Sequence, residues 1–179
     1  MFDKKKNKIV VTGGSGFVGT HTVKALREKG YKVFSFDLKE YLDIRNINVI
    51  SQLIEKGDKV LHLAAIARFS EADNDPLLAY EINVQGTKNI AEVCWWNGAE
   101  RLVYSSTGSV YMPIKEEPPI TEKFEAKGNS VYGCSKYVGE LYVQKGNTPW
   151  IILRYAHLYG EGKKGHGAIG GFVDRMERG

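Results

Sequence analysis

Short apolar runs alternate along the chain with longer segments in which apolar residues recur every three or four positions. Short apolar runs are typical of buried strands, and the longer periodicity is typical of helices. The expected strands are residues 8–12, 32–36, 60–65, 101–105 and 150–155. The expected helices are residues 17–29, 47–56, 77–96 and 131–145, with a further helix from 172 to 178. Strands that alternate with helices predict an α/β fold with a parallel sheet and right-handed crossovers.

Three connections depart from a regular alternation. Only residues 38–42 separate Asp37 from Asp43, whereas a helix-and-strand crossover needs about a dozen residues. One unit of the sheet is therefore expected to be shortened or missing there. Residues 107–130 form a long, proline-bearing segment, and loops of this length are usually functional. A further loop is expected after the third strand, as far as Asp75.

The first strand runs directly into three glycines spaced three residues apart, and a helix is expected behind them. Gly13 allows a tight turn, Gly16 lets the backbone approach a pyrophosphate, and Gly19 lets the helix pack close to the strand. The helix N-terminus offers N–H groups to the phosphates. Asp37 ends the second strand, where a carboxylate can bind the adenosine ribose and would repel a 2′-phosphate. This favours NAD over NADP, a preference that Lys39 could soften.

A second chemical motif lies on the expected helix 131–145. Tyr132 and Lys136 are one turn apart on the same face, so the ammonium should lower the phenol pKa from about 10 toward neutrality. A tyrosinate could then accept the proton of an alcohol as hydride leaves for a nicotinamide. Ser105, Ser106 and Thr107 end the fourth strand, where a hydroxyl can stabilise a substrate oxygen. By itself, a tyrosine and a lysine at this spacing are more often surface residues, and hydroxyls at a strand end more often cap the loop that follows. The glycine turn earlier in the chain favours the catalytic interpretation of both motifs.

Bulk composition excludes several classes of function. The 179 residues are 42% hydrophobic and 26% charged with a net charge of +4, which fits one soluble domain better than a nucleic-acid binder. No apolar run is long enough for a membrane span, and the basic leader 1–7 does not resemble a signal peptide. Cys94 and Cys134 fit neither a metal site nor a disulfide framework. The chain is therefore expected to be cytoplasmic, with no metal.

Taken in order, the motifs resemble those of the NAD(P)-dependent epimerase/dehydratase family, the extended short-chain dehydrogenases/reductases that act on nucleotide sugars. The similarity covers residues 7–179. It rests on segments 12–19, 43–45, 62–65, 83–87, 105–107, 132–136, 153–155 and 159–160. The resemblance implies a doubly wound, Rossmann-like cofactor domain at residues 8–179. Most of the C-terminal substrate domain would be absent, because its elements only begin at about 157–179.

The resemblance also implies roles for individual residues. The NAD-binding residues would be Gly13, Gly16, Phe17, Val18, Gly19, Asp37, Asp43, Ile44, Leu63, Ala64, Ala65, Ser105, Tyr132 and Lys136. Among these, Asp43 and Ile44 would flank the adenine. Thr107, Tyr132 and Lys136 would be the catalytic groups, and Ser106, Thr107 and His157 would face the substrate. Asn83 would be structural, and His157 could equally be a packed histidine.

Within this family, the residues favour an epimerase, closest in type to the nucleotide-sugar 4-epimerases. Similar 4,6-dehydratases carry an Asp-Glu pair after the position of Thr107, and Gly108 and Ser109 stand there instead. An epimerase oxidises a sugar hydroxyl to a keto sugar and returns hydride to the other face. The short connections 37–43 and 144–150 resemble the dTDP-4-dehydrorhamnose reductases, which often use NADPH. That reductase is the alternative activity.

Two interpretations from other classes stay open. The family usually continues for well over 100 residues beyond this point, so the chain could be a truncated cofactor domain or a non-catalytic NAD sensor. Tyr132 and Lys136 argue against a sensor, which needs no acid–base pair. A homodimer is expected through helices 77–96 and 131–145. Trp95 and Trp96 could lie in that interface, although such residues are more often part of the core.

Overall fold

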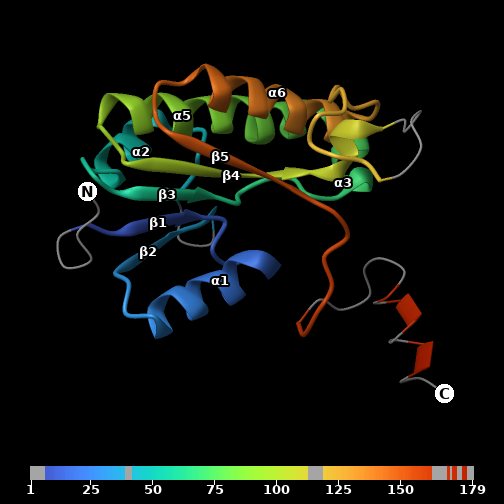
Figure 1. Cartoon of the computed structure of the whole chain (residues 1–179), viewed down its shortest axis with the longest axis horizontal. Coiled ribbons are helices and arrows are strands. Elements are labelled where there is room, and N and C mark those ends of the chain that lie inside the picture. The colour runs from blue at the N-terminus through green and yellow to red at the C-terminus, as the bar shows by residue number, and fades with distance from the viewer. Residues whose placement is uncertain are drawn as a thin grey trace.

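The computed structural model describes residues 7–38, 42–112, 119–162, 169, 171–172 and 175–176. It contains a five-stranded parallel sheet in the order β2-β1-β3-β4-β5 (Figure 1). The strands are β1 (Ile9–Thr12), β2 (Val33–Phe36), β3 (Lys59–His62), β4 (Arg101–Thr107) and β5 (Trp150–Tyr155). Within the described residues β2 forms the edge of the sheet, and no further strand follows it before α2. The predicted shortening after Asp37 is therefore confirmed.

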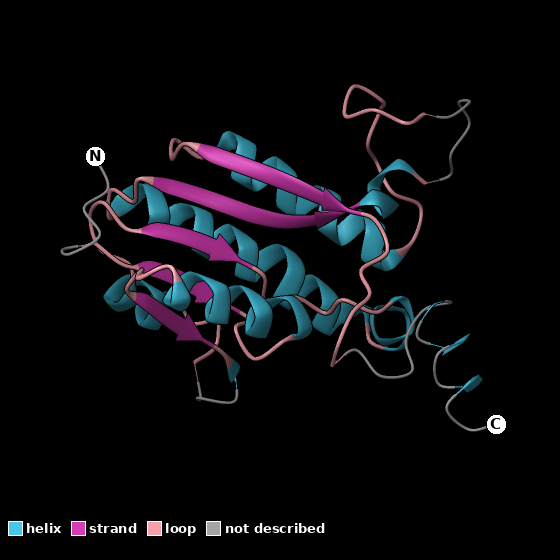
Figure 2. Ribbon diagram, turned by 60° about the horizontal axis from the view of Figure 1, so that its bottom comes forward, coloured by secondary structure: helices cyan, strands magenta, loops and turns pink. Residues whose placement is uncertain are grey.

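Helices cover the two faces of the sheet unequally. The helical segments are α1 (Phe17–Glu28), α2 (Ile47–Leu53), α3 (Phe69–Asn74), α4 (Pro76–Tyr80), η2 (Glu81–Gly86), α5 (Thr87–Trp96), η3 (Gly108–Tyr111) and α6 (Val131–Lys145). α1 lies against one face beside β1 and β2, and α2, α5 and α6 lie against the other (Figures 1 and 2). Since strand side chains alternate between faces, Val10, Val60 and Tyr104 join the core with α5 and α6. Val11 packs instead with Val23 of α1.

Local signals explain where several helices begin. Asn46 caps α2, Asp75 caps α4 and Ser130 caps α6, each with a side-chain oxygen that accepts a backbone N–H of the first turn. Pro76 occupies the first position of α4, where its missing N–H is not needed. The chain leaves α1 through Gly30, at a positive φ of 76°. These helix starts agree with the predicted ones to within one residue.

Four sequence expectations need correction. The expected loop before Asp75 contains the short helix α3. The third strand ends at His62 and not at residue 65. The expected helix 77–96 is helical throughout but includes the π-helical segment η2. Trp95 and Trp96 are 51% and 58% exposed, so they are not core residues.

The π-helical segment η2 positions a buried amide between two parts of the fold. The Asn83 side chain accepts a hydrogen bond from the backbone N–H of Ile66 at 2.8 Å and donates to its carbonyl at 3.0 Å. It also donates to the Ser135 hydroxyl on α6 at 2.9 Å. Inserted π turns often accompany functional sites. Here the segment connects α6 to the backbone that follows β3, which supports the structural role expected for Asn83.

Some sequence expectations fall outside the described residues. These are the leader residues 1–6, Lys39, residues 113–118 of the proline-bearing loop and much of the helix expected at 172–178. In the part of the chain that the structure describes, no helix has the length and apolar character needed to cross a membrane. The same residues contain no cluster of three or more side chains suited to a metal ion.

Candidate cofactor and catalytic site

The glycine turn after β1 has the three backbone properties that the sequence predicted. Gly13 has φ +70°, and a Cβ there would lie only 2.6 Å from the Ala64 nitrogen. A Cβ on Gly19 would clash with the Gly13 carbonyl oxygen, so the close approach of α1 requires glycine there as well. A Cβ on Gly16 would meet only the Gly13 oxygen, at 3.2 Å. The turn therefore leaves space beside Gly16.

The N-terminus of α1 begins at this open space. Gly16 is the N-cap residue of α1 and has no side chain of its own with which to cap the helix. The first N–H groups of α1, including those of Phe17 and Val18, therefore lie at a helix end whose dipole favours an anion. A helix N-terminus that directly follows a glycine turn fits a pyrophosphate. The residues present thus fit NAD at this end of the site.

Asp37 lies beside the glycine turn, as expected of a ribose ligand. The backbone N–H of Ser15 donates to Asp37 Oδ2 at 3.0 Å, which joins the turn to the end of β2. Further along, the Asp43 carboxylate binds Arg45 through Nε at 2.8 Å and Nη2 at 2.6 Å, and these hydrogen bonds lower the pKa of Asp43. The Ile44 side chain is 6% exposed and fills the hollow above Gly86. Ile44, which was expected to flank an adenine, is therefore almost wholly buried in this structure.

A hydrogen-bonded chain through a buried histidine fixes the ends of β1 and β3. Ala64 N–H donates to Thr12 Oγ1 at 3.2 Å, and that hydroxyl lies 2.7 Å from His62 Nδ1. His62 Nε2 lies 3.0 Å from Thr87 Oγ1, whose proton goes to the Asn83 carbonyl at 2.7 Å. Because Thr87 has one proton to give, His62 must donate from Nε2 and accept at Nδ1. Burial lowers the pKa of His62 to about 3, so the ring is neutral.

The predicted catalytic hydroxyls meet at the carboxyl end of β4. Thr107 is 8% exposed and caps η3 by accepting the Ser109 N–H at 3.2 Å. The nearby Thr107 hydroxyl partly offsets the burial that raises the pKa of the Tyr132 phenol, and Thr107 itself donates to the Ser109 hydroxyl at 3.2 Å. The Phe69 ring lies edge-on to Tyr132 with centroids 5.2 Å apart. Sequence reasoning missed Phe69 because its helix, α3, was expected to be a loop.

Lys136 lies one turn beyond Tyr132 on α6, but the expected effect on the tyrosine is wrong in this structure. Lys136 is 2% exposed, and its Nζ lies 4.3 Å above the ring centre of Tyr104. Burial lowers the pKa of Lys136 to about 7, against the opposing charge of Glu140. The pKa of Tyr132 is raised by burial and not lowered by the ammonium. The spacing predicted the shared face, but it could not predict how deeply both side chains are buried.

Ser106 needs a second correction, because it was expected to face the substrate. It is 3% exposed, and its hydroxyl donates to Glu140 Oε1 at 2.5 Å beneath α6. Neighbouring residues of a strand point to opposite faces, so Ser106 and Thr107 cannot both face the same ligand. Ser105 is half-buried and stays a predicted cofactor ligand.

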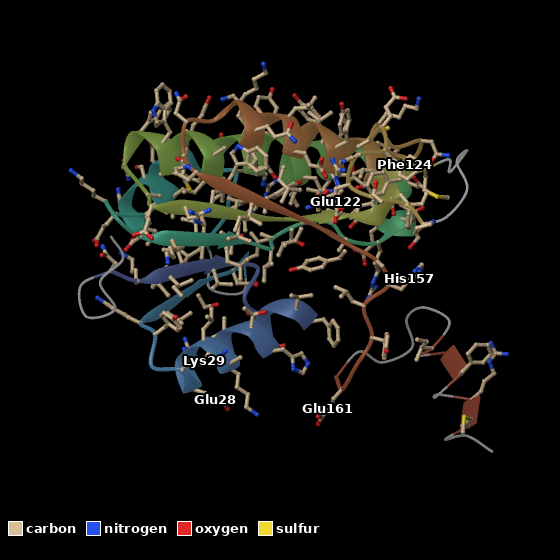
Figure 3. The ribbon with its side chains drawn as sticks, in the orientation of Figure 1. Glu28, Lys29, Glu122, Phe124, His157 and Glu161 are labelled. Carbon is tan, nitrogen blue, oxygen red and sulfur yellow. The ribbon has the colours of Figure 1, made fainter. Side chains whose placement is uncertain are left out.

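The segment after β5 runs toward α1, and His157 is exposed within it (Figure 3). This is not the packed histidine that the sequence left open. The Glu161 carbonyl lies 2.9 Å from His21 Nε2, and His21 packs edge-on against Phe17. The segment therefore reaches the N-terminal end of α1, close to the glycine turn.

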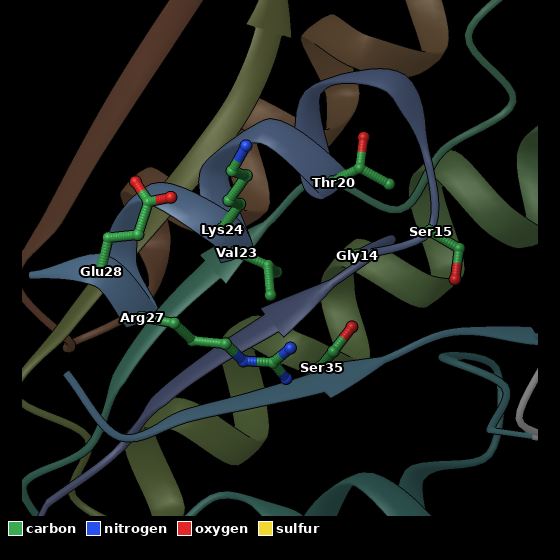
Figure 4. Close-up of a pocket in the computed structure, with 8 residues that line it drawn as sticks. All are labelled: Gly14, Ser15, Thr20, Val23, Lys24, Arg27, Glu28 and Ser35. Carbon is green, nitrogen blue, oxygen red and sulfur yellow. The ribbon is translucent and has the colours of Figure 1, made fainter. Parts of the chain in front are cut away.

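A separate hollow of about 570 Å³ lies between α1 and β2 (Figure 4). It is lined by Gly14, Ser15, Thr20, Val23, Lys24, Arg27, Glu28 and Ser35. Ser15 also belongs to the glycine turn, but Tyr132 and Lys136 do not line the hollow. Thr107, which was predicted to be catalytic, instead lies at the carboxyl end of β4, the edge at which parallel α/β sheets bind ligands.

A parallel sheet with this glycine turn, Asp37 and the Tyr132–Lys136 pair defines a dinucleotide-binding protein of the Rossmann class. Residues 9–179 match the NAD dependent epimerase/dehydratase family, and the chain belongs to that family.

Similar proteins include both epimerases and reductases. A putative UDP-glucose 4-epimerase of Methanocaldococcus jannaschii is 34% identical over 94% of this chain and 62% of its own length. The Thermus thermophilus UDP-glucose 4-epimerase, solved in complex with NAD, superposes with a TM-score of 0.83 at 30% identity, covering 96% of this chain and 62% of that one. A dTDP-4-dehydrorhamnose reductase of Clostridium acetobutylicum has a TM-score of 0.84 at 32% identity, covering 96% and 60%. The chain thus spans about three fifths of the length of these relatives.

Proposed function

We propose that the chain is the NAD-binding and catalytic part of a nucleotide-sugar epimerase. The observation that carries the proposal is that Thr107 lies close enough to Tyr132 to act on its phenol, with the buried Lys136 one turn further along α6. These groups lie at the carboxyl edge of a sheet whose first turn fits a pyrophosphate. The names of the similar epimerases support a uridine diphosphate sugar as the substrate class.

Each catalytic residue has a distinct task in the proposed reaction. Bound NAD would supply a hydride acceptor and return the hydride after the keto sugar has turned over. Tyr132 removes the proton from the sugar hydroxyl and gives it back at the end of the cycle. Thr107 donates a hydrogen bond to the same oxygen as its charge changes. Lys136 would hold the nicotinamide ribose, while its ammonium stacks on the ring of Tyr104.

The alternative activity is a reductase of the dTDP-4-dehydrorhamnose type. Its support is the missing sheet unit after β2 together with the similarity to the Clostridium acetobutylicum enzyme. Gly108 favours the epimerase, because a small residue there is common in epimerases and the reductases usually carry Asp after the Ser-Thr. The two activities differ in outcome. An epimerase leaves NAD unchanged, whereas a reductase consumes one reduced cofactor for each sugar.

The first experiment is a thermal-shift and mass-spectrometry panel with NAD, NADP and UDP-, dTDP- and GDP-sugars. We expect stabilisation by NAD and by a UDP-sugar, and interconversion of that sugar without net change in NAD. Tyr132→Phe should keep NAD binding and lower turnover by at least about 100-fold, because the phenol oxygen is the proton acceptor. Unchanged turnover would remove Tyr132 from the mechanism. Stabilisation by NAD alone would favour a cofactor domain or the non-catalytic sensor.

A homodimer through the outer faces of α4, η2, α5 and α6 belongs to the same proposal. Leu77 and Tyr80 are 78% and 53% exposed there. An apolar hollow of about 220 Å³ lies beside them, lined by Pro76, Tyr80, Val84, Val131, Cys134, Ser135 and Val138. Val138→Glu should shift the protein from dimer to monomer in sedimentation velocity, because the new charge would be buried in the interface. Lys24→Glu, on the opposite side of the molecule, is the control. A wild type that sediments as a monomer contradicts the dimer.

A cytoplasmic location also remains part of the proposal. Both cysteines are free thiols: Cys94 is buried, which raises its pKa to about 12, and Cys134 is exposed. Free thiols of this kind are usual in a reducing compartment.

A further inference from the structure

A half-exposed phenylalanine lies beside the proposed catalytic tyrosine. Phe69 is the first residue of α3, and it is 49% exposed. Its ring lies edge-on to that of Tyr132, with centroids 5.2 Å apart and planes at 68°. This is the contact geometry that aromatic pairs prefer, so Phe69 touches the phenol ring directly. The rest of its apolar surface stays open to solvent, although burial of that surface would be favourable.

Phe69 and Thr107 reach Tyr132 from neighbouring strands. β3 and β4 pair in parallel, with His62 opposite Tyr104. The chain continues from the end of β3 through residues 63–68 into α3, and β4 ends at Thr107. Because the carboxyl ends of parallel strands meet at one edge of a sheet, both segments arrive at the same edge. Tyr132 therefore has an apolar ring from α3 and a hydroxyl group from β4 as neighbours.

Buried contacts fix the position of α3. Asn83 bonds both the N–H and the carbonyl of Ile66, three residues before Phe69. Ala72, one turn after Phe69, is 0% exposed. The exposed ion pair between Arg68 and Glu71 spans the first turn at 2.9 Å and adds little. The fold thus holds the Phe69 ring in place and still leaves half of the residue exposed. Ligand pockets are commonly lined by aromatic side chains held in this way.

The sugar of the proposed substrate would lie within reach of this ring. A hydroxyl that gives its proton to Tyr132 must lie about 2.6–3.2 Å from the phenol oxygen, and Phe69 touches the same phenol. A pyranose ring has C–H groups that make part of its surface apolar, and an apolar wall is their natural partner. Such a contact is non-directional, so it suits both orientations of a keto sugar that turns over. Phe69 has no polar group that could compete for the sugar hydroxyl.

We propose that Phe69 is a specificity-determining residue, whose exposed ring contacts the C–H surface of the sugar beside Tyr132. The inference rests on the proposed function and adds to it the part of the substrate that is recognised here, which is the sugar ring and not the nucleotide. Two consequences follow. The sugar should add affinity beyond that of the nucleoside diphosphate, and most of this added affinity should depend on Phe69.

The test is isothermal titration calorimetry on the full chain loaded with NAD, with UDP and UDP-glucose as ligands. The wild type should bind UDP-glucose more tightly than UDP. In Phe69→Ala the dissociation constant for UDP-glucose should rise about tenfold, while that for UDP stays within about twofold of the wild type. Phe69→Tyr keeps the ring and should retain wild-type binding of UDP-glucose to within about threefold.

Two further variants complete the design. Phe69→Leu keeps an apolar side chain but loses the ring, and it covers the case in which Phe69→Ala does not fold. It should still weaken UDP-glucose binding by about threefold or more without changing UDP binding. Trp150→Ala is the matched control, because Trp150 is an aromatic residue, 42% exposed, at the amino-terminal end of β5. It should leave the binding of both ligands unchanged.

Steady-state kinetics distinguishes a sugar contact from mere support of the tyrosine. A contact that is equal in the ground state and the transition state raises KM and leaves kcat unchanged. We therefore expect KM to rise about tenfold in Phe69→Ala, with kcat within about threefold of the wild type. A lower kcat with unchanged KM and unchanged affinity for UDP-glucose would show that Phe69 only supports Tyr132, and it would overturn the proposal. So would a wild type that binds UDP-glucose no more tightly than UDP.

The binding measurements need no turnover, so this inference and the proposed function can fail separately. If the sugar-dependent affinity is lost in Phe69→Ala but the wild type interconverts no sugar, the inference stands and the epimerase is rejected. If Phe69→Ala interconverts the sugar with a wild-type KM, the epimerase stands and the inference is rejected.

Discussion

At the scale of single residues, Asp37 connects cofactor choice to the shape of the glycine turn. Its carboxylate accepts the Ser15 N–H, so one side chain both holds the turn and places a negative charge where an adenosine ribose would lie. A ribose diol can donate to that charge, whereas a 2′-phosphate would be repelled. We therefore expect Asp37 to give a preference for NAD over NADP without any contact to the nicotinamide end.

Replacing Asp37 with Ala tests this role. We expect the dissociation constant for NAD to rise about tenfold, which corresponds to about 1.4 kcal/mol for the lost charge-assisted hydrogen bond. NADP affinity should change little or improve, so the discrimination between the cofactors narrows. Isothermal titration calorimetry with both cofactors measures the change, and Asp73→Ala on exposed α3 is the control. A wild type that already prefers NADP would show that Asp37 has been misinterpreted.

Chemistry that depends on the local backbone could be predicted from the sequence at this scale, and chemistry that depends on burial could not. Gly13 and Gly19 were correctly assigned because a tight turn and a close helix leave room for glycine only. Ser106 was assigned to the substrate because neighbouring hydroxyls look alike in a sequence. Lys136 was expected to act on Tyr132, but the structure places its ammonium on the ring of Tyr104.

At the scale of elements, the close contact between α6 and β4 positions the Tyr132–Lys136 pair. Gly139 lies where α6 crosses Tyr104, and a Cβ there would clash with the tyrosine hydroxyl and lie 3.0 Å from Cζ. Tyr104 is fully buried and cannot swing away, and its hydroxyl donates to the Lys136 carbonyl at 3.4 Å. The helix can approach the sheet this closely only because residue 139 has no side chain.

Gly139→Ala should therefore destabilise the fold and disturb the site together. We expect the free energy of unfolding to fall by about 1–3 kcal/mol, the usual range for overpacking a core. Urea denaturation measures this loss. Gly146→Ala at the end of the same helix is the matched control, because its nearest atom would lie 3.4 Å from the new Cβ and its φ is −66°. That variant should stay within about 0.5 kcal/mol of the wild type. Equal effects from both substitutions would contradict the packing argument.

Elements that depend on tertiary contacts were the ones that sequence periodicity did not predict. The π-helical segment η2 carries Asn83, whose side chain contacts Ile66 and Ser135. Neither partner is near Asn83 in sequence. α3 is only six residues long, too short for a helical period to stand out. The longer helices α1 and α6 were predicted closely, although the buried face of α6 consists mostly of glycine and polar residues.

At the scale of the whole molecule, the shortened connection after Asp37 was predictable because chain length alone limits what it can contain. Too few residues separate Asp37 from Asp43 for a helix and a strand, and β2 accordingly forms the sheet edge. The exposure of the other edge strand, β5, could not be predicted, because an apolar strand sequence does not show whether a helix covers the strand. Trp150 and Ile151 of β5 are 42% and 40% exposed.

The pH dependence of global stability should report the buried histidine that links β1, β3 and α5. His62 has a pKa of about 3 in the folded protein against about 6.5 in the unfolded chain. Between these values the unfolded chain binds a proton that the folded protein does not, so stability must fall as the pH falls through 6.5 toward 3. At pH 5 the loss relative to pH 7 amounts to about 2 kcal/mol. Urea denaturation across this range measures it.

His62→Gln should lower stability at pH 7, because one side chain can no longer bridge Thr12 and Thr87 with the same geometry. Its distinguishing effect is on the slope: the loss between pH 7 and pH 5 should nearly disappear, since the titrating group is gone. His21→Gln removes an exposed histidine and should keep the wild-type slope. A His62→Gln protein that still loses about 2 kcal/mol over this range would show that another group carries the pH dependence. The neutral His62 ring between two threonine hydroxyls would then contribute to packing only and would not account for the loss of stability at low pH.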